Sequence, residues 1–219
     1  MDHVWDFQTV FASWPLLSQG LLNTLKLGLL TLITGLFFGF FVGLGRYSHN
    51  RWVNFPASVF VEVFRNTPAL VQIMWFYFAF PIISPFDIDA FAAAALGLGL
   101  NTTAFCAEIF RGGIQSIHRG QWEAGKALGM TYREQVWRII LPQAVVRMIP
   151  AFMNRVVELM KMTSLASVIA FGELMHQAKA ISTYHFNPIE SYTVVALIFF
   201  VVISPFAFLV YRLENRFRK

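Results

Sequence analysis

The sequence has few charged residues and a single cysteine. Charged residues make up 13% of its 219 residues and hydrophobic residues 57%, whereas roughly a quarter of an average soluble domain is charged. Because Cys106 stands alone, the chain cannot form an internal disulfide or a metal site built on several thiolates. The shortage of charge excludes an ordinary soluble domain and is typical of an integral membrane protein.

The sequence also lacks the motifs of common enzyme and metal sites. Its five histidines show no His-x-x-x-His or carboxylate spacing, so we expect no metal site. No serine, cysteine or aspartate arrangement indicates hydrolysis, and no Gly-rich loop ending in Lys-Ser or Lys-Thr follows a strand. We therefore expect that the chain is not an enzyme, holds no cofactor and does not hydrolyse ATP itself.

Apolar stretches long enough to cross a bilayer occur five times. A spanning helix needs roughly 20 mostly apolar residues. The candidate spans are about 20–45, 57–80, 90–110, 148–171 and 191–211. The fourth carries Arg155, Glu158 and Lys161, so we expect it to face protein or a cavity and not lipid. The sequence predicts an all-α integral membrane protein in which residues 1–219 form one transmembrane domain.

Basic residues are distributed unevenly between the ends of these spans. Cytoplasmic loops are enriched in lysine and arginine. Such residues follow the first and third spans and end the chain: Arg46, Arg51, Arg111, Arg119, Lys126, Arg133, Arg138, Arg147, Arg212, Arg216, Arg218 and Lys219. The first residues carry Asp2 and Asp6 and lack the basic region of a cleavable signal peptide, so we expect the first span to be retained. We predict an external N-terminus, a cytoplasmic C-terminus and no nucleic-acid partner, since topology accounts for the net charge of +5.

A polar, amphipathic segment lies in the predicted cytoplasmic loop 118–142. We predict two short helices there, the first over about 121–128 and closed by Gly129 in a left-handed conformation. Thr131 and Glu134 form a capping box that starts the second helix, and we expect Pro142 to end it.

The first of these helices presents small and apolar side chains. Ala124, Ala127 and Leu128 allow the groove of a partner protein to approach closely. The alternative is an amphipathic helix that rests on the membrane interface, which is common for basic segments that contain a tryptophan.

Three polar clusters lie near the centres of their predicted spans, around 66–68, 101–103 and 158–162. Polar groups at that depth are costly unless they bond to each other, to water or to a ligand, so they indicate a transport path. Pro68 interrupts a helix and can free backbone groups for a substrate. The candidate path residues are Asn66, Thr67, Asn101, Thr102, Arg155, Glu158, Met162, Thr163 and Ser164.

Within this set, Arg155, Glu158 and Met162 recur at i, i+3 and i+7 and share one helix face. That face offers a donor and an acceptor, which a zwitterionic amino acid needs. The alternative is an internal Arg155–Glu158 or Glu158–Lys161 ion pair that only stabilises the bundle. Hydroxyls such as those of Thr163 and Ser164 are more often bonded to their own backbone than to a ligand.

Several motifs resemble permeases of ATP-binding-cassette (ABC) importers. Glu123-Ala124-x, three residues, Gly129, nine residues and Ile-x-Leu-Pro ending at Pro142 resemble the signature coupling loop of these permeases, with Gly125 in place of the usual alanine. Stretches 64–72, 107–117, 120–124 and 161–169 resemble permeases of the polar amino acid uptake family, which serves histidine, arginine, glutamine and glutamate.

This resemblance implies partners and a location. The docking residues for separate ATP-hydrolysing subunits are Glu123, Ala124, Gly125, Ala127, Leu128 and Gly129. A second permease subunit, identical or homologous, and an extracytoplasmic binding protein complete the importer in the bacterial inner (cytoplasmic) membrane. Met162 stands where many relatives carry an aspartate, which favours a neutral or acidic amino acid over a basic one.

Three other functions fit parts of the pattern. The chain could be an ABC permease for another small solute, such as an osmoprotectant or an anion. It could be an ion-coupled secondary transporter in which Glu158 and Lys161 relay ions, although no internal inverted repeat is evident. It could also be a membrane-bound assembly factor without transport.

Overall fold

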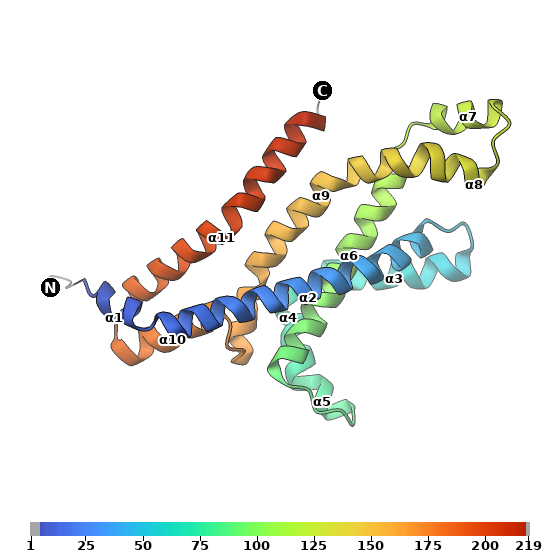
Figure 1. Cartoon of the computed structure of the whole chain (residues 1–219). Coiled ribbons are helices and arrows are strands. Elements are labelled where there is room, and N and C mark those ends of the chain that lie inside the picture. Colours follow the sequence, from blue (N-terminus) through green and yellow to red (C-terminus); the bar gives the residue numbers. More distant parts are fainter. Residues whose placement is uncertain (1–4, 218–219) are drawn as a thin grey trace.

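The computed structural model describes residues 5–217, and every element in this range is helical (Figure 1). In chain order the elements are α1 (Phe7–Ala12), α2 (Trp14–Tyr47), α3 (Arg51–Asn66), α4 (Ala69–Met74), η1 (Trp75–Ala79), α5 (Phe80–Ile83), α6 (Ala90–Gln115), α7 (Arg119–Ala127), α8 (Tyr132–Gln135), η2 (Val136–Ile140), α9 (Leu141–Met162), η3 (Thr163–Ile169), α10 (Leu174–His185) and α11 (Pro188–Phe217). The predicted all-α class is confirmed for the described residues. Asp2, Arg218 and Lys219, which entered the charge argument, lie outside them.

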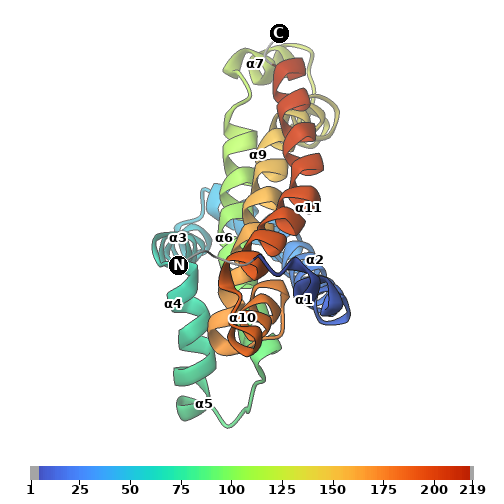
Figure 2. The same ribbon diagram turned by 90° about the vertical axis from the view of Figure 1, so that its left-hand side faces the viewer.

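Among residues 5–217, four helical segments are long and apolar enough to cross a membrane. They are Trp14–Tyr47, Ala90–Gln115, Tyr132–Ile169 and Pro188–Arg212. The first begins before residue 20, and the third begins well before residue 148, so both exceed their predicted bounds. The segment α7–α8 and the C-terminal end of α11 lie at one end of the molecule, and α5 lies at the other (Figures 1 and 2).

The span expected over 57–80 is not one straight helix. Its place is taken by two helical pieces, Arg51–Asn66 and Ala69–Ile83, which meet at an angle of 102°. Thr67 adopts an extended conformation (φ −97°, ψ 132°) between them. A proline disfavours the helical conformation in the residue before it, and Pro68 therefore enforces the bend.

The expectation that Pro142 ends a short second helix is wrong. Helix α8 continues through η2 and α9, so that Tyr132–Ile169 is one helical segment of 38 residues. The Leu141 N–H donates to the Val136 carbonyl, five residues back, in a widened π turn. Pro142 occupies the first turn of α9 directly after it. A proline lacks an N–H and crowds the preceding turn, and the widened turn accommodates both effects.

Helix α10 was not expected, because its residues lie in a predicted outer loop. It packs on the start of α2, where Gly20 leaves room for the Glu173–Leu174 backbone. The fully buried Glu173 carboxylate caps α10 by accepting hydrogen bonds from the N–H groups of Met175 (2.9 Å) and His176 (2.7 Å). Burial raises the pKa of this carboxyl to about 7.

Helices α2 and α6 run in the same sense, cross at an angle and touch along a row of glycines. The glycine–partner pairs are Gly35 with Thr102, Gly39 with Cys106, and Gly43 with Ala107. Glycines spaced four apart let membrane helices approach closely, because no side chain separates the backbones. The largest buried cluster lies beside this contact and joins side chains from α2, α4, α6, α9 and η3.

Replacing Gly39 with alanine should destabilise the fold by about 1–3 kcal/mol, the usual effect of overpacking a tight contact. The new Cβ would lie 2.6 Å from the Cys106 Cβ and 3.0 Å from the Thr103 carbonyl oxygen. Thermal unfolding in detergent measures the change. Gly112→Ala on α6 is the matched control, because its Cβ would meet nothing within 4 Å. We expect this control to be neutral or slightly stabilising, and equal destabilisation by both changes would contradict the prediction.

Candidate functional site

The side chain of Arg155 on α9 is the centre of a polar network. It is only 2% exposed. Its Nη2 donates to Asn101 Oδ1 (2.8 Å) and to Thr102 Oγ1 (3.0 Å) on α6, while Nη1 donates to Glu158 Oε2 (2.9 Å). The guanidinium carbon lies 4.4 Å from the centre of the Phe105 ring, which adds a cation–π contact. The structure thus brings together four of the predicted path residues.

The network extends to the break between α3 and α4. In an unbroken helix the Phe64 carbonyl would accept a hydrogen bond from the N–H of residue 68, which is a proline and has none. Asn101 Nδ2 donates to this carbonyl (2.9 Å), and Gln72 Nε2 donates to it as well (2.9 Å). Pro68 does free a backbone acceptor, as expected, but two side-chain amides of the chain occupy it.

Glu158 gives the network an accessible side. Its side chain is 52% exposed, although one carboxylate oxygen is paired with the buried Arg155. Met162, one turn further along α9, places its sulfur 3.9 Å from Arg155 Nη1. Of the two ion pairs considered from the sequence, the structure contains Arg155–Glu158, and none joins Glu158 to Lys161 among the residues described. A buried cation therefore lies behind a carboxylate that other molecules can reach.

The side chains of four predicted path residues do not join this network. Asn66 Nδ2 donates to Glu62 Oε2 (3.1 Å), and the Thr67 hydroxyl donates to the Val63 carbonyl (2.8 Å), both within α3 and its end. The hydroxyls of Thr163 and Ser164 likewise donate to their own backbone, at 2.7 and 2.8 Å. Their geometry matches the packing interpretation of these hydroxyls.

Sequence reasoning missed Gln72 and Phe105 as members of the network. Gln72 is 5% exposed and bridges the two sides of the break by also donating to the Thr67 carbonyl (2.9 Å). Phe105 follows Asn101 by one turn of α6 and so lies on the same face. A glutamine four residues after a proline, within an otherwise apolar stretch, is the sequence signal that could have identified Gln72.

A second charged cluster lies nearer the end of α6. Arg46 of α2 pairs with Glu108 (2.6 Å) and with Glu62 of α3 (2.5 Å). Arg111 also pairs with Glu108, and Arg65 lies 3.9 Å from the same carboxylate. These pairs join α2, α3 and α6 and leave little free charge there.

The predicted docking segment has the expected local structure. Gly129 adopts a left-handed conformation (φ +72°) after α7, and the capping box of Thr131 and Glu134 starts α8. Gly125 faces inward, because a Cβ there would lie 2.8 Å from Gln135 Cγ. Leu128 is 77% exposed.

The docking candidates differ in their solvent exposure. Glu123, Ala124 and Ala127 are exposed, as is Gly129. Gly125 is buried and serves the contact between α7 and α8. The outward side of the segment therefore presents exposed apolar side chains.

Comparisons with known proteins agree with this architecture. Residues 35–219 match the family described as binding-protein-dependent transport system inner membrane component. The chain is 38% identical over 215 residues to the glutamine transport system permease protein GlnP of Escherichia coli (strain K12), which covers 97% of this chain and 98% of that protein. It is 33% identical over 213 residues to the arginine transport system permease protein ArtQ of Bacillus subtilis (strain 168), and 97% of each chain is covered.

A solved structure has the same architecture. A chain in the crystal structure of an amino acid ABC transporter with histidines superposes with a TM-score of 0.92 and 35% identity, covering 98% of this chain and 100% of that chain. The chain therefore belongs to the family of binding-protein-dependent transport system inner membrane components, as an amino acid ABC importer permease and not an enzyme.

Proposed function

We propose that the chain forms one half of the substrate path of an ATP-driven importer for polar amino acids and transmits the action of a separate ATPase subunit to that path. A second permease subunit, identical or homologous, supplies the other half. The observation that carries this proposal is the Arg155–Glu158 pair, which is buried on one side, accessible on the other and tied to a broken helix. Broken helices and intramembrane ion pairs are features of transport paths.

The charge distribution supports an external N-terminus and a cytoplasmic C-terminus. Basic residues occur at the end of α2 and the start of α3, on α7 and near the end of α11: Arg46, Arg51, Arg119, Lys126 and Arg212. Asp87 and Asp89 lie between α5 and α6, at the end of the molecule opposite α7. Positive charge is retained on the cytoplasmic side, so α7 faces the cytoplasm of a bacterial cell.

The state of the ion pair favours a neutral or acidic amino acid. Arg155 already neutralises the carboxylate of Glu158, and Met162 adds no second carboxylate. A basic amino acid carries a second cation, which would find no further carboxylate there, whereas the single α-ammonium of a neutral or acidic amino acid can contact the exposed side of Glu158. Similarity to a glutamine permease agrees with a neutral substrate, although similarity to an arginine permease is nearly as strong.

The outward face of α7 supports docking on the ATPase. Ala124 and Leu128 lie one turn apart on this face and are exposed. An apolar helix face set into a groove is a common recognition mode. ATP is bound and hydrolysed in the partner, and an extracytoplasmic binding protein delivers the amino acid, so this chain needs no cofactor of its own.

Uptake by the complete importer in proteoliposomes tests the proposal. We expect ATP-dependent uptake of labelled glutamine or glutamate at least about tenfold above that of arginine, equivalent to roughly 1.4 kcal/mol of selectivity. Arginine as the best substrate would contradict the substrate class. A matched preparation without the ATPase subunit is the control, and uptake that persists in it would contradict the ATP-driven mechanism.

A further inference from the structure

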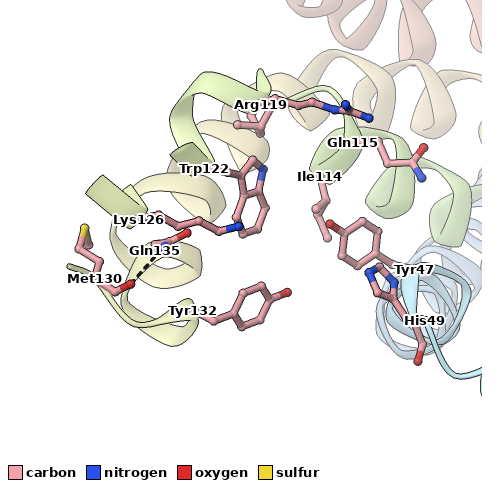
Figure 3. A pocket seen from close by; sticks show the side chains of 12 residues that line it. Tyr47, His49, Ile114, Gln115, Arg119, Trp122, Lys126, Met130, Tyr132 and Gln135 are labelled. Carbon is pink, nitrogen blue, oxygen red and sulfur yellow. Dashed lines mark hydrogen bonds between the residues drawn. The ribbon is translucent and has the colours of Figure 1, made fainter. Parts of the chain in front are cut away.

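A large open cavity separates the α2–α3 turn from the α7–α8 segment. Its volume is about 960 Å³. In Figure 3, Tyr47 and His49 border it on one side, and Lys126 and Tyr132 border it on the other. The polar network around Arg155 takes no part in it, so it is a separate site.

The charged side chains that line this cavity are basic. Arg119 and Lys126 supply two cations, and no described residue that lines it is acidic. Neither cation forms an ion pair with any side chain that the structure describes. The Lys126 ammonium and the hydroxyls of Tyr47 and Tyr132 point toward the same space (Figure 3). Such a site fits an anionic group that accepts several hydrogen bonds.

The cavity uses a different face of α7 from the proposed docking face. Arg119, Trp122 and Lys126 line it and recur at i, i+3 and i+7. With 3.6 residues per turn, Ala124 and Leu128 lie on the opposite side of the helix. An ATPase subunit that docks on Ala124 and Leu128 leaves the basic cavity facing the rest of the permease and the membrane.

Exposed aromatic side chains place this region at the membrane surface. Trp52 and Phe55 at the start of α3 are 89% and 64% exposed, and Trp137 on η2 is 64% exposed. Tryptophan is enriched at the level of the lipid headgroups. Basic pockets between membrane helices on the cytoplasmic side bind acidic headgroups.

We propose that this cavity binds the phosphate-bearing headgroup of an anionic phospholipid of the cytoplasmic leaflet. The proposal depends on the orientation given under Proposed function. The side chains of Arg119 and Lys126 bind the phosphate, and the hydroxyls of Tyr47 and Tyr132 donate hydrogen bonds to it. Because these residues come from both sides of the cavity, the bound lipid links α7 to the α2–α3 turn.

Native mass spectrometry of the complete importer tests this site. The complex is reconstituted with phosphatidylglycerol and phosphatidylcholine and transferred to neutral detergent, and retained lipid is counted. We expect preferential retention of phosphatidylglycerol, reduced about fivefold for each cation removed and about 25-fold in Arg119→Gln/Lys126→Gln. The matched control Arg133→Gln/Arg138→Gln removes two exposed cations of the same segment outside the cavity and should change retention less than twofold.

Several outcomes would overturn the proposal. They are an equal loss in both double variants, no loss in either, and no preference for phosphatidylglycerol in the unmodified complex. A soluble source of the anion is indicated if millimolar inorganic phosphate displaces phosphatidylglycerol completely, and that result overturns the lipid assignment. Loss of the ATPase subunit from Arg119→Gln/Lys126→Gln in every lipid would assign the cavity to the subunit interface instead. Because lipid retention is measured without transport, failed amino acid uptake would refute the proposed function and leave this result standing.

Discussion

Replacing Arg155 with methionine is expected to abolish uptake and to destabilise the fold by roughly 2–4 kcal/mol, because two buried side-chain oxygens lose their donor. The guanidinium satisfies Asn101, Thr102 and one oxygen of Glu158. Methionine fills part of the volume but leaves these groups without their donor, and unsatisfied buried groups are costly. Thermal unfolding of the purified complex and uptake in proteoliposomes measure the two effects.

A second substitution separates transport from stability at the same site. Glu158→Gln keeps an oxygen that can accept from Arg155 but removes the charge. We expect a smaller loss of stability, about 1–2 kcal/mol, together with uptake at least about tenfold lower, because a carboxylate binds an ammonium more strongly than an amide does. Normal uptake by Glu158→Gln would mean that the ion pair only stabilises the bundle.

Changing Leu128 to aspartate is expected to uncouple the permease from its ATPase. Leu128 is 77% exposed, so the change removes few contacts within the chain and should leave its unfolding temperature unchanged. In a docked complex the change places an unpaired carboxylate in an apolar interface, which costs about 2 kcal/mol or more and predicts about a 30-fold loss of uptake and of substrate-stimulated ATP hydrolysis. Both activities are measured on the reconstituted complex.

The matched control for docking is Arg133→Ser, an exposed residue of the same segment outside the docking set. We expect it to retain uptake within about twofold, the scatter of surface substitutions. If Leu128→Asp transports as well as this control, α7 does not dock through its apolar face. A fall in unfolding temperature for Leu128→Asp would instead indicate a structural role.

Most membrane helices could be predicted because a bilayer sets both their length and their composition. The stretches beginning near Gly20 and Ala90 are mostly apolar, and inside a bilayer such a stretch satisfies its own backbone groups by forming a helix. A hydropathy profile carries no information about the direction of a helix axis. The 102° bend after Asn66 was therefore missed, although Pro68 was identified as an interruption. Hydropathy also cannot distinguish a polar loop from a docked amphipathic helix, and α10 was missed for that reason.

The site was predictable where spacing alone fixes neighbours. Arg155 and Glu158 lie three residues apart on one helix, and their pairing follows from helical geometry. The contact of Arg155 with Asn101 depends on how α6 packs against α9. The similar depth of the two residues in the membrane suggested that they are near each other, but it could not specify the contact. The close approach of α2 to α6 had a signal in the sequence, the four-residue spacing of Gly35, Gly39 and Gly43, which the prediction did not use.

The continuous helical segment from Tyr132 to Met162 joins the proposed docking segment to the Arg155 network. At 1.5 Å per residue, about 35 Å of helix axis separates Tyr132 from Arg155. Helix α9 contains Pro150 and bends (Figure 1), which shortens the straight arm, so a tilt of about 5° at the Tyr132 end moves Arg155 by at most about 3 Å, the length of one hydrogen bond. Under the proposed coupling, a small displacement of the α7–α8 segment would therefore carry the guanidinium a distance comparable to its hydrogen bonds with Asn101 and Thr102, without any helix having to unfold.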